Sequence, residues 1–301
     1  MDILNKLAAQ TMPLVPKSIV GKISRRYIAG DSIDDAVRVV RDINNKRIMA
    51  TLDVLGEDIT NREEARHNAD DYIKALEIID KEKLDSNVSL KLTALGLKLD
   101  FDFCIENVSR VITRAKESGL FVRIDMEDST CTTDTIRAYL MLQKKYGNVG
   151  IVIQAYLRRS VSDCEKLLAE SENLNVRLCK GAYVESRSVV YKDRELIKKN
   201  FSLLLTILSS NGAYVGIASH DEEMVWEGLK IIHYLKLPKD AYEFQMLVGV
   251  DEELRDIIVN AGHRMRVYVP YGEKWYAYSV RRLKENPEIA GYVIKNLLGI
   301  K

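Results

Sequence analysis

The sequence predicts an α/β protein built as a (β/α)8 TIM-like barrel with a short N-terminal helical arm. Three observations carry this prediction: eight short β-branched runs, a segment of helical period after each run, and a length of 301 residues. Alternation of strand and helix is typical of a parallel sheet, and barrels of this class reach about 250 residues as one domain. A doubly wound open sheet also alternates, but it rarely has eight such units without a glycine-rich phosphate turn.

The predicted strands follow one another at a regular interval of about 25 to 40 residues, which is the length of one strand, one helix and two loops. Between the first two, Thr60 and Glu63 predict a capping box, and apolar residues from Ala65 to Ile79 then recur on one helical face that should pack on the barrel. The eight strands are residues 48–54, 88–95, 121–126, 150–156, 176–181, 214–219, 242–248 and 265–269.

One domain boundary is predicted, near residue 45. Residues 1–45 form the N-terminal helical arm, in which Ser32 with Asp35 begins a helix before the first strand. Residues 46–301 form the catalytic barrel together with its C-terminal helices. No internal repeat beyond the βα unit is present.

The charge balance argues against several function classes. Forty-five Lys and Arg against 44 Asp and Glu give a formal charge of +1, so no global field exists to hold nucleic acid or an anionic membrane. No apolar run approaches the ~18 residues needed to span a bilayer, and the N-terminus lacks a signal-peptide pattern. We therefore expect a cytoplasmic protein that binds no nucleic acid.

Metal and dinucleotide motifs are missing from the sequence. The histidines show neither HxH nor HExxH spacing, no carboxylate cluster shows octahedral-site spacing, and no GxGxxG or GxxxxGK[ST] turn is present. We expect no metal, and a dinucleotide would have to bind without a Rossmann turn. The cysteines form no CxxC motif and indicate neither zinc nor a redox pair; they are Cys104, Cys131, Cys164 and Cys179.

Polar side chains recur at the carboxyl ends of the predicted strands, where the active site of such a barrel lies. Large polar groups inside apolar strands are expensive to bury unless they pair with one another or bind a ligand, and both interpretations stay open for each single residue. His220 could equally cap a helix or bridge two loops. The set is Asp53, Glu57, Lys91, Thr93, Asp125, Glu127, Gln154, Arg177, Lys180, Ser219, His220, Asp221, Gln245, Arg266 and Tyr268.

The charges in this set indicate the kind of ligand. Lys91, Arg177, Lys180 and later arginines outnumber Asp125 and Glu127, which predicts an anionic small molecule or a phosphate-bearing cofactor.

The segment after the last strand predicts a two-sided helix that Pro287 ends. Tyr278, Arg281 and Arg282 share one face of this helix. That face is either the solvated side of an ordinary amphipathic helix or a carboxylate clamp with an aromatic wall. The sequence alone leaves the choice open.

At this point the chain resembles a known family, the FAD-dependent proline dehydrogenases. The two specific motifs are Arg177-Leu-Cys-Lys-Gly-Ala-Tyr183 and Tyr278-Ser-Val-Arg-Arg-Leu283. Weaker matching blocks, in order and one per strand, are residues 51–57, 88–94, 123–127, 152–156 and 243–247, so that the resemblance covers about residues 30–290. The resemblance implies a (β/α)8 enzyme that oxidises L-proline to Δ1-pyrroline-5-carboxylate and passes electrons to quinone.

The resemblance also implies roles for the site residues. Lys91, Arg281 and Arg282 would hold the substrate carboxylate, and Tyr268 and Tyr278 would wall the proline ring. Asp125 is similar to a carboxylate that orients cationic neighbours, and Glu57 is similar to an acidic gate that pairs with an arginine of the last helix. The expected FAD contacts are Gln154, Arg177, Lys180, Gly181 and His220, with Arg177 near the flavin N(5) locus.

Two departures from the family pattern are visible. Val184 stands where some relatives place a tryptophan over the flavin region. No aldehyde dehydrogenase domain follows, so we expect a monofunctional enzyme, with a separate pyrroline-5-carboxylate dehydrogenase acting downstream. Because the expected electron acceptor is a membrane quinone, the resemblance is also compatible with peripheral contact with the inner face of the cell membrane.

Two rival functions stay open on the residues alone. A strand lysine, Lys91 or Lys180, could serve as the nucleophile of a Schiff-base lyase or aldolase. A non-catalytic binding scaffold is the third hypothesis. Bound flavin that is reduced by proline would exclude both.

Overall fold

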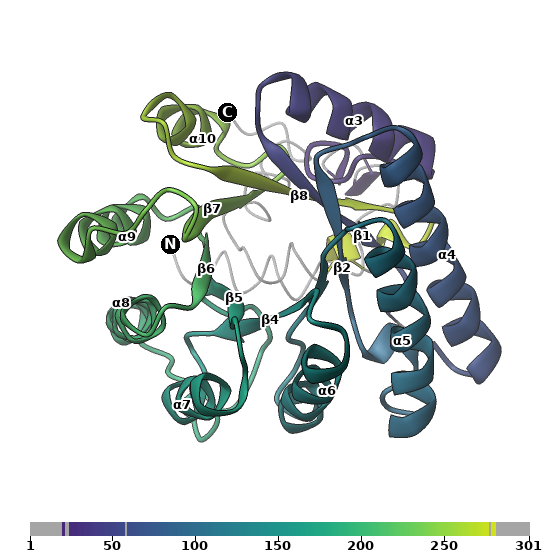
Figure 1. The fold of residues 1–301 in the computed structure, drawn as a ribbon, viewed down its shortest axis with the longest axis horizontal. Helices are drawn as coiled ribbons and strands as arrows, with labels where there is room; N and C mark the ends of the chain where they lie inside the picture. The colour runs from purple at the N-terminus through teal and green to yellow at the C-terminus, as the bar shows by residue number, and fades with distance from the viewer. Residues whose placement is uncertain (1–19, 22–23, 58, 277, 281–301) are drawn as a thin grey trace, which may run out of the picture.

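The computed structural model describes residues 20–21, 24–57, 59–276 and 278–280. Eight parallel strands pair in chain order, and β8 pairs with β1 to close the barrel (Figure 1). The predicted fold class is therefore confirmed. The strands are β1 (Met49–Val54), β2 (Ser86–Leu90), β3 (Val122–Ile124), β4 (Val149–Gln154), β5 (Asn175–Cys179), β6 (Tyr214–Ala218), β7 (Tyr242–Leu247) and β8 (Met265–Tyr271).

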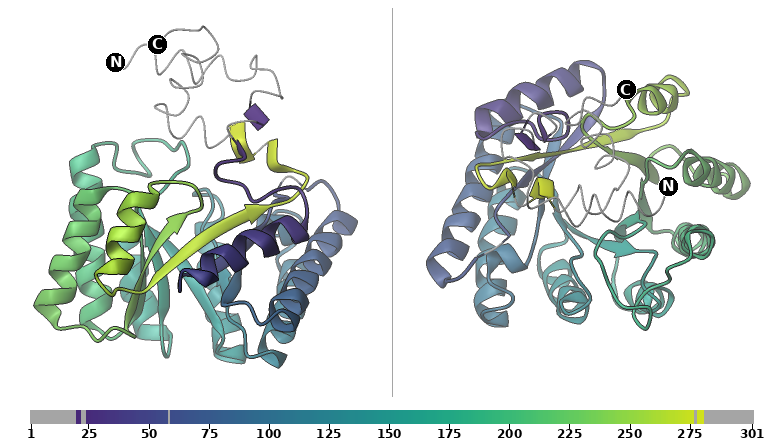
Figure 2. Two further views of the ribbon diagram at one scale, coloured as in Figure 1. Left: turned by 90° about the horizontal axis from the view of Figure 1, so that it is seen from above. Right: turned by 180° about the vertical axis from the view of Figure 1, so that it is seen from behind.

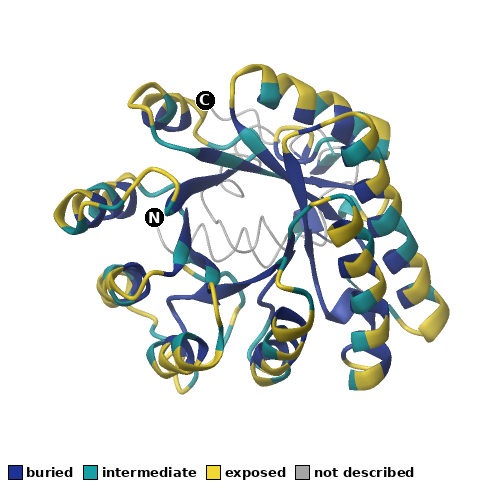
Figure 3. Cartoon of the chain, in the orientation of Figure 1, coloured by how far each residue is buried: buried dark blue, intermediate teal, exposed yellow. Residues whose placement is uncertain are grey.

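Helices surround the strands, with their buried faces toward the barrel and their exposed faces outward (Figure 3). None of the helices in the described part of the chain is long and apolar enough to cross a membrane. The elements are α3 (Ile33–Asn45), α4 (Arg62–Lys81), η2 (Thr93–Leu95), α5 (Phe101–Glu117), α6 (Thr132–Tyr146), α7 (Ser160–Glu170), α8 (Arg194–Ser210), α9 (Glu222–Leu235) and α10 (Glu252–Asn260).

Helix α3 packs against both β8 and β1, the place that a helix after the last strand would otherwise fill. Its predicted capping box is present, since Ser32 and Asp35 each cap the other's backbone. Its buried residues, among them Val37 and Val40, belong to the main hydrophobic core. The helical part of the predicted arm thus covers the barrel, while the domain boundary near residue 45 stays a prediction.

The strands have an apolar outer face and a polar inner face. Along β1, Ala50 and Leu52 are fully buried in the core beneath the helices. The residues that alternate with them point the other way, because successive side chains of a strand lie on opposite faces. Contacts between strands that are not neighbours show that this second face lines the interior: Arg177 of β5 pairs with Asp125 after β3.

Two local predictions differ from the structure. Strand β2 ends at Leu90, and the segment predicted as its continuation forms the short helix η2. Helix α4 begins after Asn61, whose side chain accepts a hydrogen bond from the Glu64 backbone N–H, so the capping box predicted for Thr60 and Glu63 is wrong. Thr60 instead donates both its backbone N–H and its hydroxyl to Glu64. The cap is displaced by one residue because asparagine is at least as good an N-cap as threonine.

Both ends of the described chain meet beside the carboxyl end of β8. The Ala29 N–H donates to the Pro270 carbonyl at 2.9 Å, and the Gly272 N–H donates to the Gly30 carbonyl at 3.0 Å. Residues 275–276 and 278–280 are helical, and Ser24 donates to Ser279 at 2.6 Å. Figure 2 shows this C-terminal helical segment above the carboxyl ends of the strands, on the side where a barrel carries its active site.

Candidate active site at the carboxyl ends of the strands

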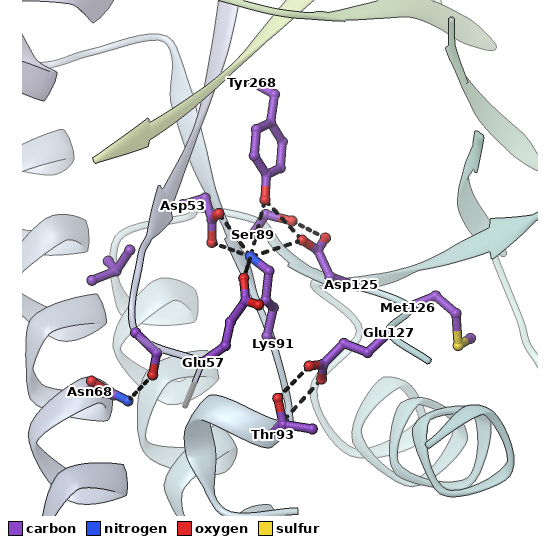
Figure 4. A network of polar contacts seen from close by, with 12 residues as sticks. Asp53, Glu57, Asn68, Ser89, Lys91, Thr93, Asp125, Met126, Glu127 and Tyr268 are labelled. Carbon is purple, nitrogen blue, oxygen red and sulfur yellow. Dashed lines mark hydrogen bonds and ion pairs between the residues drawn. The ribbon is translucent and has the colours of Figure 1, made fainter. Parts of the chain in front are cut away.

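Lys91 lies at the centre of a buried ionic cluster at this end of the barrel (Figure 4). It directly follows β2, and its ammonium donates to both oxygens of Asp53 at 2.7 and 2.8 Å. Because β1 and β2 are parallel neighbours, their carboxyl ends meet and bring the two side chains together. Both are buried, with side-chain exposures of 6% for Lys91 and 0% for Asp53.

Two further carboxylates surround the same ammonium. Glu57 Oε1 lies 3.4 Å and Asp125 Oδ2 lies 3.7 Å from Lys91 Nζ. Burial alone would lower the pKa of Lys91, but the three carboxylates, led by Asp53, raise it well above its usual value. Lys91 is therefore held as a cation.

Asp53 is the most deeply buried acid of the cluster. Burial raises the pKa of Asp53, and Lys91 opposes this effect only in part. The hydroxyl of Tyr72, from α4 behind the barrel, lies 3.4 Å from Asp53 Oδ1. Tyr72 therefore helps to position Asp53, which in turn holds the Lys91 ammonium.

Asp125, directly after β3, connects the lysine to the opposite side of the barrel. It accepts hydrogen bonds from Ser89, from Arg177 and, at 3.0 Å, from the Tyr268 hydroxyl. Burial alone would raise the pKa of Asp125, but Arg177 and then Lys91 lower it below its usual value. Asp125 is therefore ionised, and it orients a guanidinium and a phenol at once.

Tyr268 of β8 lies between the two cations of the cluster. Its hydroxyl is 3.4 Å from Lys91 Nζ, and the Arg177 guanidinium lies over its ring at 5.0 Å from the ring centroid. Burial, followed by the charges of Asp125 and Asp53, raises the pKa of Tyr268 well above its usual value. The phenol therefore stays protonated and donates a hydrogen bond to Asp125.

A second layer of contacts supports this cluster. Glu127 accepts hydrogen bonds from both the backbone N–H and the hydroxyl of Thr93, the former at 3.0 Å. Burial raises the pKa of Glu127 although these bonds oppose the shift. Asn68 of α4 donates to the carbonyls of Gly56 and Ala94 at 3.0 and 2.9 Å, which ties the loops after β1 and β2 to the helix behind them.

The buried part of the cluster has more carboxylates than cations. Asp53, Glu57 and Asp125 lie around Lys91 and Arg177, so three acids face two bases. The cationic excess expected from the sequence does not hold here, because that count left out Asp53 and Glu57. An anionic ligand at this end would need cations beyond these two.

The residues expected to contact FAD lie on the next strand ends. Gln154, at the end of β4, donates to the Met126 carbonyl at 3.1 Å, and its buried Oε1 has no hydrogen-bond partner among the described residues. Gly181, just after β5, has φ +106° and lies so close to the Tyr156 ring that a Cβ would overlap it. Glycine is therefore required at this position, both by the positive φ and by the packing of the Tyr156 ring against the backbone.

The other two expected contacts have clear environments. His220 follows β6, and its Nε2 accepts the Leu247 backbone N–H at 2.8 Å, so part of its role is to bridge the ends of β6 and β7. Lys180 is exposed. Val184 is 88% exposed, which leaves open space where some relatives place a tryptophan.

Schiff-base chemistry at either lysine is disfavoured by these surroundings. A nucleophilic amine must lose its proton, and such lysines are normally activated by an apolar or cationic environment. Lys91 has the opposite environment, three carboxylates, and Lys180 is exposed to solvent.

Of the last helix, Tyr278 is described, whereas Arg281 and Arg282 lie outside the described residues. Tyr278 is 4% exposed and packs in a small apolar cluster with Tyr27, Ile28 and Leu55. Leu55 directly follows β1. Tyr278 is also close enough to Tyr268 to contribute to the raised pKa of that phenol. The helix that carries Tyr278 therefore lies near the ionic cluster.

Some polar strand residues expected at this end lie at the other one. Arg266 pairs with Met49, the first residue of β1, and its guanidinium bonds Glu243 near the start of β7. Gln245 donates to the same Glu243 at 2.6 Å. The position of Arg266 as the second residue of β8 is the signal that could have separated it from Tyr268. Gln245 lies past the middle of β7, and only its contact with Glu243 assigns it to this group.

Sequence reasoning missed three members of the site. Asp53 was noted at a strand end but given no role, and Ser89 was not considered, although it precedes Lys91 by two residues on the same strand face. Tyr72 was predicted only as part of an apolar helix stripe, and nothing in that stripe indicates that its hydroxyl reaches Asp53. In the part of the chain that the structure describes, no group of His, Cys, Asp and Glu is arranged to hold a metal.

Comparison with known proteins identifies the family of the chain. A family model described as "Proline dehydrogenase" matches residues 36–294. Proline dehydrogenase 1 of Bacillus subtilis subsp. natto is 36% identical over 275 residues, covering 91% of this chain and 90% of the relative. Proline dehydrogenase of Deinococcus radiodurans is 36% identical over 281 residues, covering 92% of this chain and 90% of the relative.

A solved structure gives the same result for the fold. The proline utilization A (PutA) protein of Bdellovibrio bacteriovorus, inactivated by N-propargylglycine, superimposes with a TM-score of 0.83 at 28% identity. The match covers 93% of this chain and 34% of that one, so this chain corresponds to about a third of the longer protein. With a family match over most of its length and relatives above a third identity, the chain belongs to the proline dehydrogenase family of oxidoreductases.

Proposed function

We propose that this enzyme oxidises L-proline to Δ1-pyrroline-5-carboxylate with FAD as the hydride acceptor. The ring carbon beside the nitrogen, on the side away from the carboxylate, loses a hydride, and the nitrogen loses a proton. A C=N bond forms, and two electrons leave the substrate. The observation that best supports this proposal is the Lys91 ammonium fixed at the strand ends beside Tyr268 and the Arg177–Asp125 pair.

The substrate carboxylate is held by Lys91 together with Arg281 and Arg282 in this proposal. The acidic excess around Lys91 supports this assignment, since the described cations are already shared among carboxylates. Added guanidiniums from the last helix would supply the positive charge that a carboxylate ligand requires. Tyr268 and Tyr278 form the walls of the ring pocket.

Glu57 and Asp125 position these groups. Asp125 holds Arg177 and the Tyr268 phenol in place, and its lowered pKa keeps it ionised while it does so. Glu57, 3.4 Å from Lys91, is the acidic gate that pairs with an arginine of the last helix. The substrate amine binds neutral or releases its proton to solvent, so no histidine base is needed.

The residues at the ends of β4, β5 and β6 fit a bound flavin nucleotide. Gln154 offers a buried acceptor that no described residue bonds, and Gly181 lies beside it after the neighbouring strand β5. Arg177 supplies fixed positive charge where negative charge would develop on the cofactor, and Lys180 and His220 complete the set. When bound, FAD would accept the hydride that the substrate carbon releases.

We further propose that the electrons pass to a membrane quinone. The enzyme would then work in the cytoplasm, with peripheral contact to the inner face of the cell membrane. In this proposal, a separate pyrroline-5-carboxylate dehydrogenase takes up the product.

The test is a visible absorption spectrum of the purified protein, recorded before and after anaerobic addition of L-proline. We expect flavin bands that bleach when proline is added. The same anaerobic addition of buffer without proline should leave the bands unchanged.

A colourless protein, or flavin bands that proline leaves intact, would contradict the proposal. A Schiff-base enzyme would instead be trapped covalently at a lysine by borohydride in the presence of a carbonyl substrate. Lys91→Met and Lys180→Met would locate such an adduct.

A further inference from the structure

The amino ends of the strands line an open cavity of about 380 Å³, at the opposite end of the barrel from the cluster around Lys91. We call this the floor cavity. It is far larger than the ~30 Å³ that one water molecule occupies in the liquid. Its wall includes Asn175 and Tyr214, the first residues of β5 and β6, and the charged residues Asp85, Arg123, Glu243, Arg264 and Arg266.

Glu243 and Arg266 neutralise each other in this wall. Arg266 Nε lies 2.7 Å from Glu243 Oε1 and Nη2 lies 3.1 Å from Oε2, so the pair is bidentate. Tyr214 also donates to Glu243 at 2.7 Å. Burial alone would raise the pKa of Glu243, but Arg266 lowers it below its usual value. This carboxylate is therefore fully engaged and cannot neutralise a third charge.

Arg123 has no carboxylate within ion-pair distance in the described ranges of the chain. Arg123 as a whole residue is only 3% exposed. Its guanidinium donates to the carbonyls of Ile151 and Asn175 at 3.0 and 2.7 Å. Burial, followed by the charge of Arg177, lowers its pKa to about 9. A buried guanidinium without an anion is expensive, and an anion in the cavity would relieve that cost.

Arg264 adds a second guanidinium without an acidic partner among the described residues. It is partly exposed, lies 5.7 Å from the Tyr214 ring centroid and contacts the Met49 sulfur at 3.6 Å. Asp85, the remaining acid of the wall, is exposed to solvent. After the Glu243–Arg266 pair is set aside, the wall keeps two guanidiniums against one exposed carboxylate.

Asn87 gives an independent indication of a ligand. It lies in β2 on the inner face, it is 6% exposed, and it lines the floor cavity. Its Oδ1 has no hydrogen-bond partner in the described part of the chain. Buried polar atoms are nearly always paired, and an unpaired one needs an explanation such as a ligand that binds there.

We propose that the floor cavity binds a small oxyanion that carries a hydroxyl, of the inorganic phosphate class. The guanidiniums of Arg123 and Arg264 would bind its charged oxygens. Asn87 Oδ1 would accept a hydrogen bond from its hydroxyl. The site is separate from the proposed proline site, since its walls are the starts of the strands rather than their ends.

The test is calorimetric titration of the FAD-loaded enzyme with inorganic phosphate, and separately with sulfate, at constant ionic strength set with chloride. Sulfate has the charged oxygens of phosphate but no hydroxyl near neutral pH, so only phosphate can donate to Asn87. We expect wild type to bind phosphate more tightly than sulfate.

Three variants locate the binding. Arg264→Gln should raise the Kd for phosphate roughly ten- to over a hundredfold, since it removes a charge-assisted hydrogen bond. Asn87→Val should narrow the preference for phosphate over sulfate. Lys230→Gln, the same loss of one charge on the exposed face of α9, should leave both affinities unchanged.

Folding of each variant is checked by its thermal unfolding without phosphate. Arg264 suits this test because it is partly exposed and its replacement breaks no ion pair in the described structure. If Arg264→Gln does not fold, Asn87→Val alone decides through the ratio of the two affinities.

Three results would overturn the proposal: no heat of phosphate binding to wild type, equal affinity for the two anions, or unchanged affinities in both floor variants. Phosphate binding that is lost in Lys91→Met would also overturn it, because that result places the anion at the other end. Bleaching of the flavin by proline is read separately, so this proposal can fail while the proposed function stands.

Discussion

The two ends of the barrel interior each carry a buried ionic cluster, and their charge balances are opposite. At the carboxyl ends of the strands, three carboxylates share Lys91 and Arg177. At the amino ends, the wall carries the guanidiniums of Arg123, Arg264 and Arg266, and its buried carboxylate, Glu243, pairs with Arg266. Both clusters come from the same inward-facing register of the strands.

The difference lies in how the charges are satisfied. At the floor, Glu243 and Arg266 form a closed bidentate pair, and Arg123 donates to backbone carbonyls. At the other end, Lys91 contacts several carboxylates at once, two of them at 3.4 and 3.7 Å. Closed pairs are expected to stabilise the fold, whereas shared, looser contacts can be rearranged by a ligand.

The largest expected effect comes from breaking the closed pair. Glu243→Gln should lower the free energy of unfolding by ~3 to 5 kcal/mol, because it leaves the Arg266 charge buried without compensation. Proline turnover per bound flavin should stay at the wild-type level. Urea denaturation and an artificial-acceptor assay on the same preparations measure the two quantities.

The double variant Glu243→Gln with Arg266→Met is the control for this prediction. It removes both charges and should recover a large part of the lost stability. If Glu243→Gln instead abolished turnover in folded, flavin-loaded enzyme, the separation between the two ends would be wrong.

The next effect tests the carboxylate clamp at the opposite end. Arg281→Met or Arg282→Met should remove a charge-assisted hydrogen bond of ~1.5 to 3 kcal/mol and raise KM for proline roughly ten- to over a hundredfold. FAD should stay bound. Steady-state kinetics measure this, and near-wild-type KM in both variants would mean that this face of the helix is only solvated.

The pH dependence of stability separates two acids of the same cluster. The folded-state pKa of Asp125 is lowered, so its contribution is present above the ordinary pKa of ~3.9 and is lost as the pH falls through the folded value. Asp125→Asn should therefore be less stable than wild type at pH 7, by roughly 1 to 3 kcal/mol. The deficit should shrink as the pH falls from 5 toward 3.

Asp53 should show the opposite sign. Its folded-state pKa is raised, so its favourable contribution is present below the ordinary value and is lost as the pH rises through the folded value. The stability of Asp53→Asn relative to wild type should therefore improve as the pH rises from 4 toward 7. Urea unfolding across this range measures both variants, and parallel pH profiles for the two would refute the assigned environments.

The smallest expected effect concerns Tyr278 and the far side of the substrate. Its aromatic wall should reject 4-hydroxyproline, because the hydroxyl of that substrate loses its hydration without a compensating partner. Tyr278→Phe keeps the wall but removes the phenol oxygen that crowds the added hydroxyl. It should change proline turnover only moderately and reduce the difference in kcat/KM between the two substrates. An unchanged gap in both Tyr278→Phe and Tyr278→Ala would show that the ring packs away from the pocket.

Strand pattern and family motifs were sufficient to predict the barrel and the gathering of polar side chains at its strand ends. Lys91, Asp125, Arg177 and Tyr268 meet because parallel strands of a closed barrel bring their carboxyl ends together. This consequence follows from topology alone. The strand order and the alternation of side chains were therefore readable from the sequence.

Other features depend on tertiary distances that no local pattern records. Tyr72 lies on a helix stripe that looks purely apolar, yet its hydroxyl reaches Asp53 through the barrel wall. Arg266 and Tyr268 are two residues apart on one strand face, and the strand register places them in different clusters. Helix α3 fills the gap between β8 and β1, which leaves the segment after β8 available to lie over the strand ends.

The most direct test of the whole account is the rate of flavin bleaching after anaerobic rapid mixing with L-proline, measured against proline concentration in matched variants of the two ends. Lys91→Met should keep its flavin and need roughly ten- to over a hundredfold more proline to reach half its maximal rate, since it loses a charge-assisted contact to the substrate. Glu243→Gln should follow the wild-type curve. A Lys91→Met enzyme that bleaches with the wild-type concentration dependence would contradict the account.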